Sequence, residues 1–419
     1  MKEDEICIII GASHAGVNCA FTLRREGWLG SIIIYDKDPQ TPYHRPPLSK
    51  SFLTSDSDVD DHLLMSLESY KKENIDLRCG ITVTNINRND RSVILSDGSV
   101  QSYDKLVLAT GAKALVPDII GIKNSSRIFY LRSARDANQI RKSCHSSDSK
   151  RVVIIGGGYI GLESAASLRQ LGAEVTVLER DHRLLSRVTA PEMSDYFLQL
   201  HTAKGVVIGL NKNVSSIESQ ADFDSVICAD GTQYHADLII LGVGVTVNTS
   251  LAKESGLQID NGIKVDNRTQ TLDEHIYAIG DCTNHFNFHY KKNIRLESVQ
   301  NAVDQAKVAA KNICRKEAQH DTVPWFWSDQ YDVKLQMVGL SSGYNEVLLR
   351  NKENDNTSFS IWYFKDEELL AVDAVNSPKA YVLGSKFIKG HKRINKSILK
   401  NTEIPLKPSL LIVIESKRT

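Results

Sequence analysis

Residues 151–179 read RVVIIGGGYIGLESAASLRQLGAEVTVLE, and their pattern is the most specific structural signal in the chain. A β-branched run ends at Gly156, and apolar residues then follow helical spacing as far as Gly172. A second apolar run ends in the acid Glu179. The order of strand, glycine-rich turn, helix and strand predicts a Rossmann-like nucleotide-binding unit.

Each small residue of this turn has a physical role. Gly156 permits the tight turn, Gly158 lets backbone approach a pyrophosphate, and Gly161 lets helix and strand pack closely. The helix N-terminus then faces the phosphate charge. Glu179 follows Gly161 at the spacing of an acid that binds the adenosine ribose. Its charge repels a 2′-phosphate, so the pattern favours NADH, although Arg180 beside it leaves NADPH open.

The same pattern occurs at the start of the chain. Residues 5–36 read EICIII, GASHAG, VNCAFTLRREG and, after a short link, SIIIYD. Gly11 and Gly16 occupy the turn and packing positions, and Asp36 takes the place of the ribose-binding acid. Ser13 replaces the middle glycine, but serine is small and can donate to a phosphate. We therefore expect two dinucleotide folds in one chain.

Composition excludes several classes. The formal net charge of +0 argues against a dedicated nucleic-acid binder. The acidic N-terminus resembles no signal peptide, and no apolar run is long enough to span a membrane. The seven cysteines have no CxxC or Cys/His spacing, so we expect no metal site, no redox dithiol and a cytoplasmic location. Residues 379–419 are strongly basic, as either a solvated face or a docking surface for an acidic partner.

Further motifs resemble one family. They are YHRPPLSK (43–50), YDKLVLATGA (103–112), VVIIGGGYIGLE (152–163), TLDEHIYAIGD (271–281), LESVQNA (296–302), PWFWSDQY (324–331) and AVDAVN (371–376). In this order they resemble the FAD-dependent NADH:ferredoxin and rubredoxin reductases of bacterial oxygenase systems. The resemblance implies an α/β fold of the glutathione-reductase style, with two Rossmann-like domains and a mixed α/β C-terminal domain. The expected domains are FAD-binding (1–112 and 245–320), NAD-binding (113–244) and C-terminal (321–419), the last covering the flavin and facing the electron carrier.

The resemblance also implies an activity. Electrons would pass from NADH through FAD to a small acidic iron–sulfur carrier, with a [2Fe–2S] ferredoxin expected before rubredoxin. The carrier would feed an oxygenase such as a cytochrome P450 or a ring-hydroxylating dioxygenase. Two alternatives stay open: an NADH oxidase or small-molecule reductase, and an NADH-responsive binding protein of the apoptosis-inducing-factor type. The oligomeric state, monomer or weak dimer, is not fixed.

Site residues follow from the same resemblance. Lys50 and Glu163 are the expected catalytic pair near flavin N5, although a surface lysine and an ordinary helix N-terminal acid would look alike. Tyr159 is expected to cover the nicotinamide, or else is a packing tyrosine, and Trp327 is the expected docking residue for the carrier. The implied FAD contacts are Ala15, Arg45, Lys50, Val83, Ala109, Thr110, Gly111, Arg132, Asp281 and Val299. The implied NAD contacts are Tyr159, Ile160, Glu163 and Gly244.

Overall fold

A computed structural model describes residues 2–145, 150–351 and 357–413. The chain divides into two compact units, and each is built from separate stretches of sequence. Unit 1 comprises Met1–His44, Ser57–Lys113 and Val245–Pro324. Unit 2 comprises Arg45–Asp56, Ala114–Gly244 and Trp325–Thr419.

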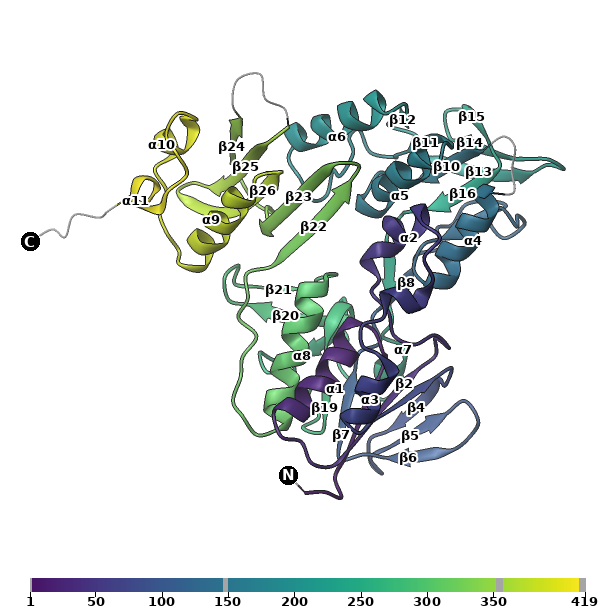
Figure 1. Ribbon diagram of the computed structural model, residues 1–419, viewed down its shortest axis with the longest axis vertical. Coiled ribbons are helices and arrows are strands. Elements are labelled where there is room, and N and C mark those ends of the chain that lie inside the picture. The colour runs from purple at the N-terminus through teal and green to yellow at the C-terminus, as the bar shows by residue number, and fades with distance from the viewer. Residues whose placement is uncertain (1, 146–149, 352–356, 414–419) are drawn as a thin grey trace, which may run out of the picture. The chain divides into compact units, whose positions relative to one another are not determined.

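Unit 1 is built on a parallel five-stranded sheet in the order β19-β7-β1-β2-β3. Two helices, α1 and α8, pack against each other beside it, as Figure 1 shows in purple and green. The strands are β1 (Ile6–Ile10), β2 (Ser31–Asp36), β3 (Ile75–Cys79), β7 (Lys105–Leu108) and β19 (Ile276–Ala278). The helices are α1 (His14–Arg25), α3 (Leu67–Lys72), α7 (Ser250–Glu254) and α8 (Val299–Ile313).

Apolar residues cover both faces of this sheet, as expected for parallel strands. Alternate residues of β1 enter different cores: Cys7 and Ile9 join the α1 and α8 cluster, while Ile8 and Ile10 join a second cluster. That second cluster includes the antiparallel strands β4 (Val83–Asn87) and β5 (Ser92–Leu95), which continue into β6 (Val100–Ser102). Smaller sheets are formed by β8 (Ala112–Ala114) with β17 (Val245–Val247), and by β18 (Ile263–Val265), β20 (Thr283–Asn287) and β21 (Lys292–Ile294).

Unit 2 contains the second Rossmann-like sheet, also parallel, in the order β12-β11-β10-β16-β9. Its strands are β9 (Ile128–Tyr130), β10 (Arg151–Ile155), β11 (Glu174–Leu178), β12 (Val207–Gly209) and β16 (Leu238–Leu241). Its helices are α4 (Ala134–His145), α5 (Tyr159–Gln170) and α6 (Pro191–Ala203). An antiparallel sheet of β13 (Val214–Ser219), β14 (Asp224–Cys228) and β15 (Gln233–Ala236) shares a core with it.

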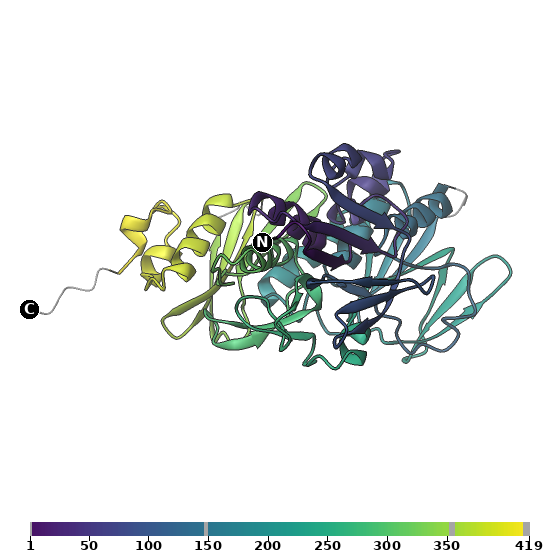
Figure 2. The same cartoon turned by 90° about the horizontal axis from the view of Figure 1, so that it is seen from below.

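The C-terminal part of unit 2 is an antiparallel sheet in the order β22-β23-β26-β25-β24, covered by α9 and drawn in light green to yellow in Figures 1 and 2. Its strands are β22 (Trp325–Gln330), β23 (Val333–Gly339), β24 (Glu346–Asn351), β25 (Phe359–Lys365) and β26 (Glu368–Val375). The helices are α9 (Pro378–Lys389), α10 (Lys396–Lys400) and α11 (Pro408–Leu411). One apolar cluster joins this sheet to the loop after β11 and to α6, so both parts of unit 2 share a core.

One short segment from the early part of the chain groups with unit 2. Residues 45–56 pack there as a 3₁₀ turn (Pro46–Ser49) followed by α2 (Ser51–Thr54). Phe52 and Leu53 are buried, and α2 lies against α4 and α5. The reason is hydrophobic: the segment has an apolar face whose burial is available on those two helices. Along the chain the two units also meet at residues 113/114, 244/245 and 324/325.

In the part of the chain that the structure describes, none of the helices meets the length and hydropathy of a transmembrane span.

Candidate functional site: two nucleotide turns and a buried ion pair

The two glycine-rich turns have matching geometry. Gly11 and Gly156 both have positive φ, +108° and +110°, which favours glycine. A Cβ on Gly16 would lie 1.9 Å from the Gly11 carbonyl oxygen, and one on Gly161 would lie 2.0 Å from that of Gly156. Helix and turn therefore approach too closely for any larger residue. A Cβ on Gly158 would meet nothing, so the space at the N-terminus of α5 is open for a ligand.

An acid stands beside each turn. Asp36, at the end of β2, accepts hydrogen bonds from the backbone N–H of Ala12 and of Asp38. Glu179, just after β11, accepts from the N–H of Gly157 at 2.7 Å and of Asp181 at 2.9 Å. These contacts fix each carboxylate at the carboxyl edge of its parallel sheet, where nucleotides bind in open α/β folds.

In unit 1 several predicted FAD residues lie at the ends of the central strands. Ala109, Thr110 and Gly111 follow β7, and Asp281 lies in the turn after β19. Gly280 in that turn donates its N–H to Gln305 of α8 at 2.7 Å, so α8 holds the turn in place. Ser13 and Ala15 belong to the α1 turn, and Val299 begins α8.

These residues fit an FAD. The backbone of the turn, the acid Asp36 beside it and two helix N-termini are provided by one unit, as a dinucleotide requires. Val83 is an exception, because its side chain is buried in the β1 and β4 core, which leaves only its backbone for a cofactor.

In unit 2 the structure brings Lys50 and Glu163 together. The Lys50 ammonium lies 2.8 Å from Oε2 of Glu163, and the carboxylate side chain is 2% exposed. Ser49 donates its hydroxyl to the same oxygen at 2.5 Å, and Ser328 donates to Oε1 at 2.7 Å. Glu163 thus accepts three hydrogen bonds, one of them from a cation, and these bonds satisfy both oxygens of the buried carboxylate.

Tyr159, one turn before Glu163, packs rather than projects freely. Its ring centroid lies 5.1 Å from that of Phe326, and its hydroxyl donates to the Met337 sulfur. Burial, and to a smaller extent the charges of Asp373 and Glu163, raises the pKa of the Tyr159 hydroxyl. Tyr159 therefore stays neutral. The neighbouring Ile160, an expected NAD contact, is exposed.

The remaining predicted contacts of unit 2 fall into two groups. The guanidinium of Arg45 donates to the Arg132 carbonyl oxygen at 2.6 Å, so these two expected FAD contacts are neighbours. Gly244 lies after β16 and has a φ of +109°, and a Cβ built on it would meet no atom within 4 Å. The predicted FAD residues are therefore divided between unit 1 and unit 2.

Trp327 lies on β22, and its ring centroid is 5.6 Å from that of Trp325. The ring centroid of Trp325 in turn lies 6.0 Å from that of Tyr381 of α9.

The basic C-terminal region divides into two parts. Lys396 and Arg393 are paired with Glu346 and Glu367, whereas α9 carries the exposed cations Lys379, Lys386 and Lys389. Residues 414–419 lie outside the described part.

Sequence reasoning missed the partners of Glu163. Ser49 and Ser328 lie inside the motifs YHRPPLSK and PWFWSDQY, and this was the available signal, but serine alone indicates no role. It also missed a buried acid. Tyr363 donates to Asp373 at 2.5 Å, and burial raises the pKa of Asp373 to about 7.

The thiols take no part in a dithiol or metal centre. All seven cysteines are free, and six are buried. Burial raises the pKa of the Cys282 thiol beside Asp281, so it stays protonated and unreactive. Within the described ranges no group of His, Cys, Asp and Glu could hold a metal ion.

Two family models match the chain. One, described as pyridine nucleotide-disulphide oxidoreductase, matches residues 6–306, and the other, described as reductase C-terminal, matches residues 325–410.

Individual relatives match nearly the whole chain. Putidaredoxin reductase of Pseudomonas putida is 39% identical, over 97% of this chain and 97% of that protein. Rhodocoxin reductase of Rhodococcus erythropolis is 38% identical, over 96% and 93%. A solved structure of a covalent putidaredoxin reductase–putidaredoxin complex aligns with a TM-score of 0.92 at 38% identity, over 97% of this chain and 98% of that chain.

Proposed function

Because the chain belongs to the pyridine nucleotide-disulphide oxidoreductase family, we propose that it is an FAD-containing reductase that oxidises NADH and reduces a small [2Fe–2S] ferredoxin. The observation that carries the proposal is the pair of matched nucleotide turns in one chain, each with its acid. Putidaredoxin reductase, whose complex with its carrier is the aligned structure, supports the choice of a ferredoxin. Rubredoxin is the less favoured carrier.

The two nucleotide turns would bind different cofactors. In unit 1, the turn from Gly11 to Gly16 and Asp36 would hold the adenosine and pyrophosphate of FAD, and Asp281 its ribityl chain. In unit 2, Gly156 to Gly161 and Glu179 would hold NADH. When bound, FAD accepts a hydride from the nicotinamide and gives up electrons singly. The protein contributes alignment of the reacting groups.

Lys50 and Glu163 would orient the reacting rings. The hydroxyls of Ser49 and Ser328 hold the Glu163 carboxylate in place, and the carboxylate in turn holds the Lys50 ammonium, so the pair has one defined geometry. We assign the carrier contact to Trp327 and the exposed lysines of α9, whose positive charge suits an acidic ferredoxin. The unpaired cysteines support a cytoplasmic location.

The experiment is a stopped-flow reduction of the purified protein with NADH, followed by oxidised [2Fe–2S] ferredoxin or by oxygen. We expect rapid loss of flavin absorbance, and reoxidation far faster with ferredoxin than with oxygen. Rapid oxygen turnover without a response to ferredoxin would instead indicate an oxidase. No loss of absorbance with NADH would contradict the proposal as a whole.

A further inference from the structure

A chain of buried polar side chains leads away from Glu163. Ser328, which donates to Glu163, lies 3.1 Å from the side-chain nitrogen of Gln330, two residues along β22. The oxygen of Gln330 lies 2.8 Å from Nε2 of His201, on α6. Nδ1 of His201 lies 3.4 Å from the Tyr331 hydroxyl. Ser328, Gln330 and His201 are each at most 1% exposed, so protein groups rather than bulk water satisfy them.

The hydrogen bonds that link these side chains all donate toward Glu163. Glu163 can only accept, so the Ser328 hydroxyl donates to it and must itself accept from the Gln330 amide. The Gln330 oxygen then faces His201 and requires a proton on Nε2, which leaves Nδ1 as the acceptor for Tyr331. Burial lowers the pKa of His201, so the imidazole is neutral and this single tautomer is defined. Ser328, Gln330, His201 and Tyr331 are called the donor chain below.

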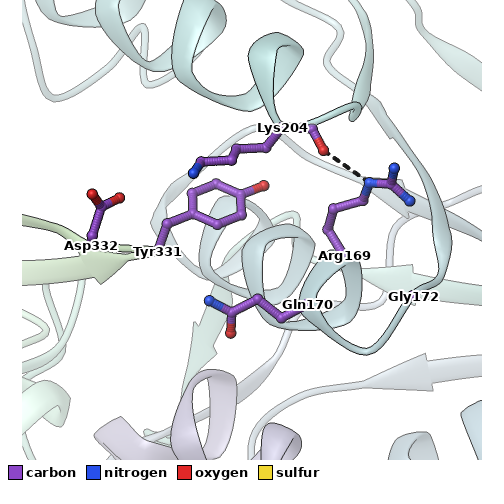
Figure 3. A pocket seen from close by; sticks show the side chains of 6 residues that line it. All are labelled: Arg169, Gln170, Gly172, Lys204, Tyr331 and Asp332. Atoms are coloured by element: carbon purple, nitrogen blue, oxygen red, sulfur yellow. Dashed lines mark hydrogen bonds between the residues drawn. The ribbon is translucent and has the colours of Figure 1, made fainter.

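The outer end of the donor chain reaches solvent. Tyr331 lines an open groove of about 640 Å³ together with Arg169, Gln170, Gly172, Lys204 and Asp332. In Figure 3 the Lys204 side chain runs beside the Tyr331 ring, and its ammonium lies 5.5 Å from the ring centroid. The Arg169 Nε–H donates to the Lys204 carbonyl oxygen at 2.9 Å, which closes the groove wall. This groove lies at the C-terminal end of α5, about 18 Å along the helix from its glycine turn.

The aligned donors strengthen the hydrogen bond to Glu163 and fix the orientation of its carboxylate. Each donor polarises the next, so the bond that reaches Glu163 is stronger than an isolated hydroxyl would make. The Gln330 amide cannot pass a proton along as a hydroxyl or imidazole can, so the chain orients charge rather than conducting protons. Without Ser328, Oε1 of the buried carboxylate would lose a donor and the carboxylate could rotate away from Lys50.

We propose that Ser328, Gln330 and His201 are positioning residues that hold the Glu163 carboxylate oriented toward Lys50. The inference rests on the proposed function only for its kinetic consequence. It adds to the site three residues that act through Glu163.

The first test needs no NADH. Selective ¹⁵N-histidine labelling of the holoprotein, with His201→Gln to assign the resonance, reports the tautomer of His201. We expect a protonated Nε2 and an unprotonated Nδ1, and loss of that preference in Gln330→Leu. A His201 protonated on Nδ1 in the unaltered protein would overturn the donor chain.

The second test is kinetic. At saturating NADH, Ser328→Ala is expected to slow flavin reduction about tenfold, the effect of one lost hydrogen bond to a charged group, with the NADH concentration at half-maximal rate unchanged. Ser328→Thr, which keeps the hydroxyl, should restore most of the rate. The matched control is Ser360→Ala, which removes another buried hydroxyl of the same sheet that instead accepts from Trp362.

The outcomes are separable. Equal slowing by Ser328→Ala and Ser360→Ala, or no rescue by Ser328→Thr, would overturn the positioning role. If NADH does not reduce the unaltered protein, the proposed function fails, while the histidine tautomer still decides whether the donor chain exists.

Discussion

Trp327 and Ser328 are adjacent on β22, and their side chains leave opposite faces of the strand. Ser328 is buried and donates to Glu163, whereas Trp327 is half-buried and stacks near Trp325. This alternation is the ordinary period of a strand. One strand therefore presents the expected carrier-docking aromatic on one side and a support of the Lys50–Glu163 pair on the other.

The docking assignment predicts a selective defect. Trp327→Ala should reduce the kcat/KM for ferredoxin about thirtyfold, the loss typical of an aromatic hot spot, while flavin reduction by NADH is unchanged. Steady-state kinetics with varied ferredoxin measures the first quantity, and stopped-flow the second. Phe288→Ala, which removes an exposed aromatic outside this strand, is the control. An equal effect of both variants on ferredoxin would exclude Trp327 from the interface.

Removing one partner of the ion pair should cost stability. Lys50→Met leaves the buried Glu163 without its cation, and we expect a loss of about 3 kcal/mol, the lower end for a buried pair because Lys50 is partly exposed. The double variant Lys50→Met/Glu163→Gln should recover most of that loss, since no charge is left buried. Urea unfolding followed by tryptophan fluorescence measures both. If the single and double variants are equally destabilised, the unpaired Glu163 carboxylate does not cause the loss in free energy of unfolding.

The choice of nucleotide should depend on Glu179. Glu179→Gln removes the charge that repels a 2′-phosphate, and its amide can still accept from the Gly157 N–H. We expect the ratio of kcat/KM for NADH over NADPH to fall about tenfold or more, mainly through better use of NADPH. Initial rates with both nucleotides give this ratio. An unchanged ratio would place the discrimination in other residues.

Asp373 should make stability depend on pH. Its pKa of about 7 lies above the ordinary value of 3.8, so between these pH values the folded state binds a proton that the unfolded state has lost. The stabilisation is complete below about pH 4 and disappears as pH rises through 7. Because each pKa unit corresponds to about 1.4 kcal/mol, the effect is at most about 4 kcal/mol.

Asp373→Asn keeps an acceptor for Tyr363 and carries no charge at any pH. At pH 8 the variant should therefore unfold at higher urea concentration than the unaltered protein, and at pH 4.5 the two should be close. If the urea midpoints of the variant and of the unaltered protein instead change by the same amount between pH 4.5 and pH 8, then Asp373 does not have a raised pKa in the folded state.

The two sheets could be predicted because their determinants are local. The contact that forbids a Cβ at Gly16 or Gly161 lies five residues away, within one turn. The Lys50–Glu163 pair was accessible only through the family resemblance. Ser49 and Ser328 reach Glu163 across 114 and 165 residues, and His201 reaches Gln330 across 129. No periodicity of the sequence encodes such distances, so only the folded chain reveals them.

The packing of α1 against α8 has a consequence for synthesis. The first helix ends at Arg25, but the helix that covers it begins only at Val299. At about 5–20 residues per second, a ribosome needs roughly 15–60 seconds to make the intervening chain. Throughout that time Val17, Ala20 and Leu23, all fully buried in the finished fold, lack their cover. The intervening segment Ala114–Gly244 can meanwhile complete its own parallel sheet. On the ribosome, the part of the molecule that begins first is therefore among the last to mature, and it is there that chaperones would find exposed apolar surface.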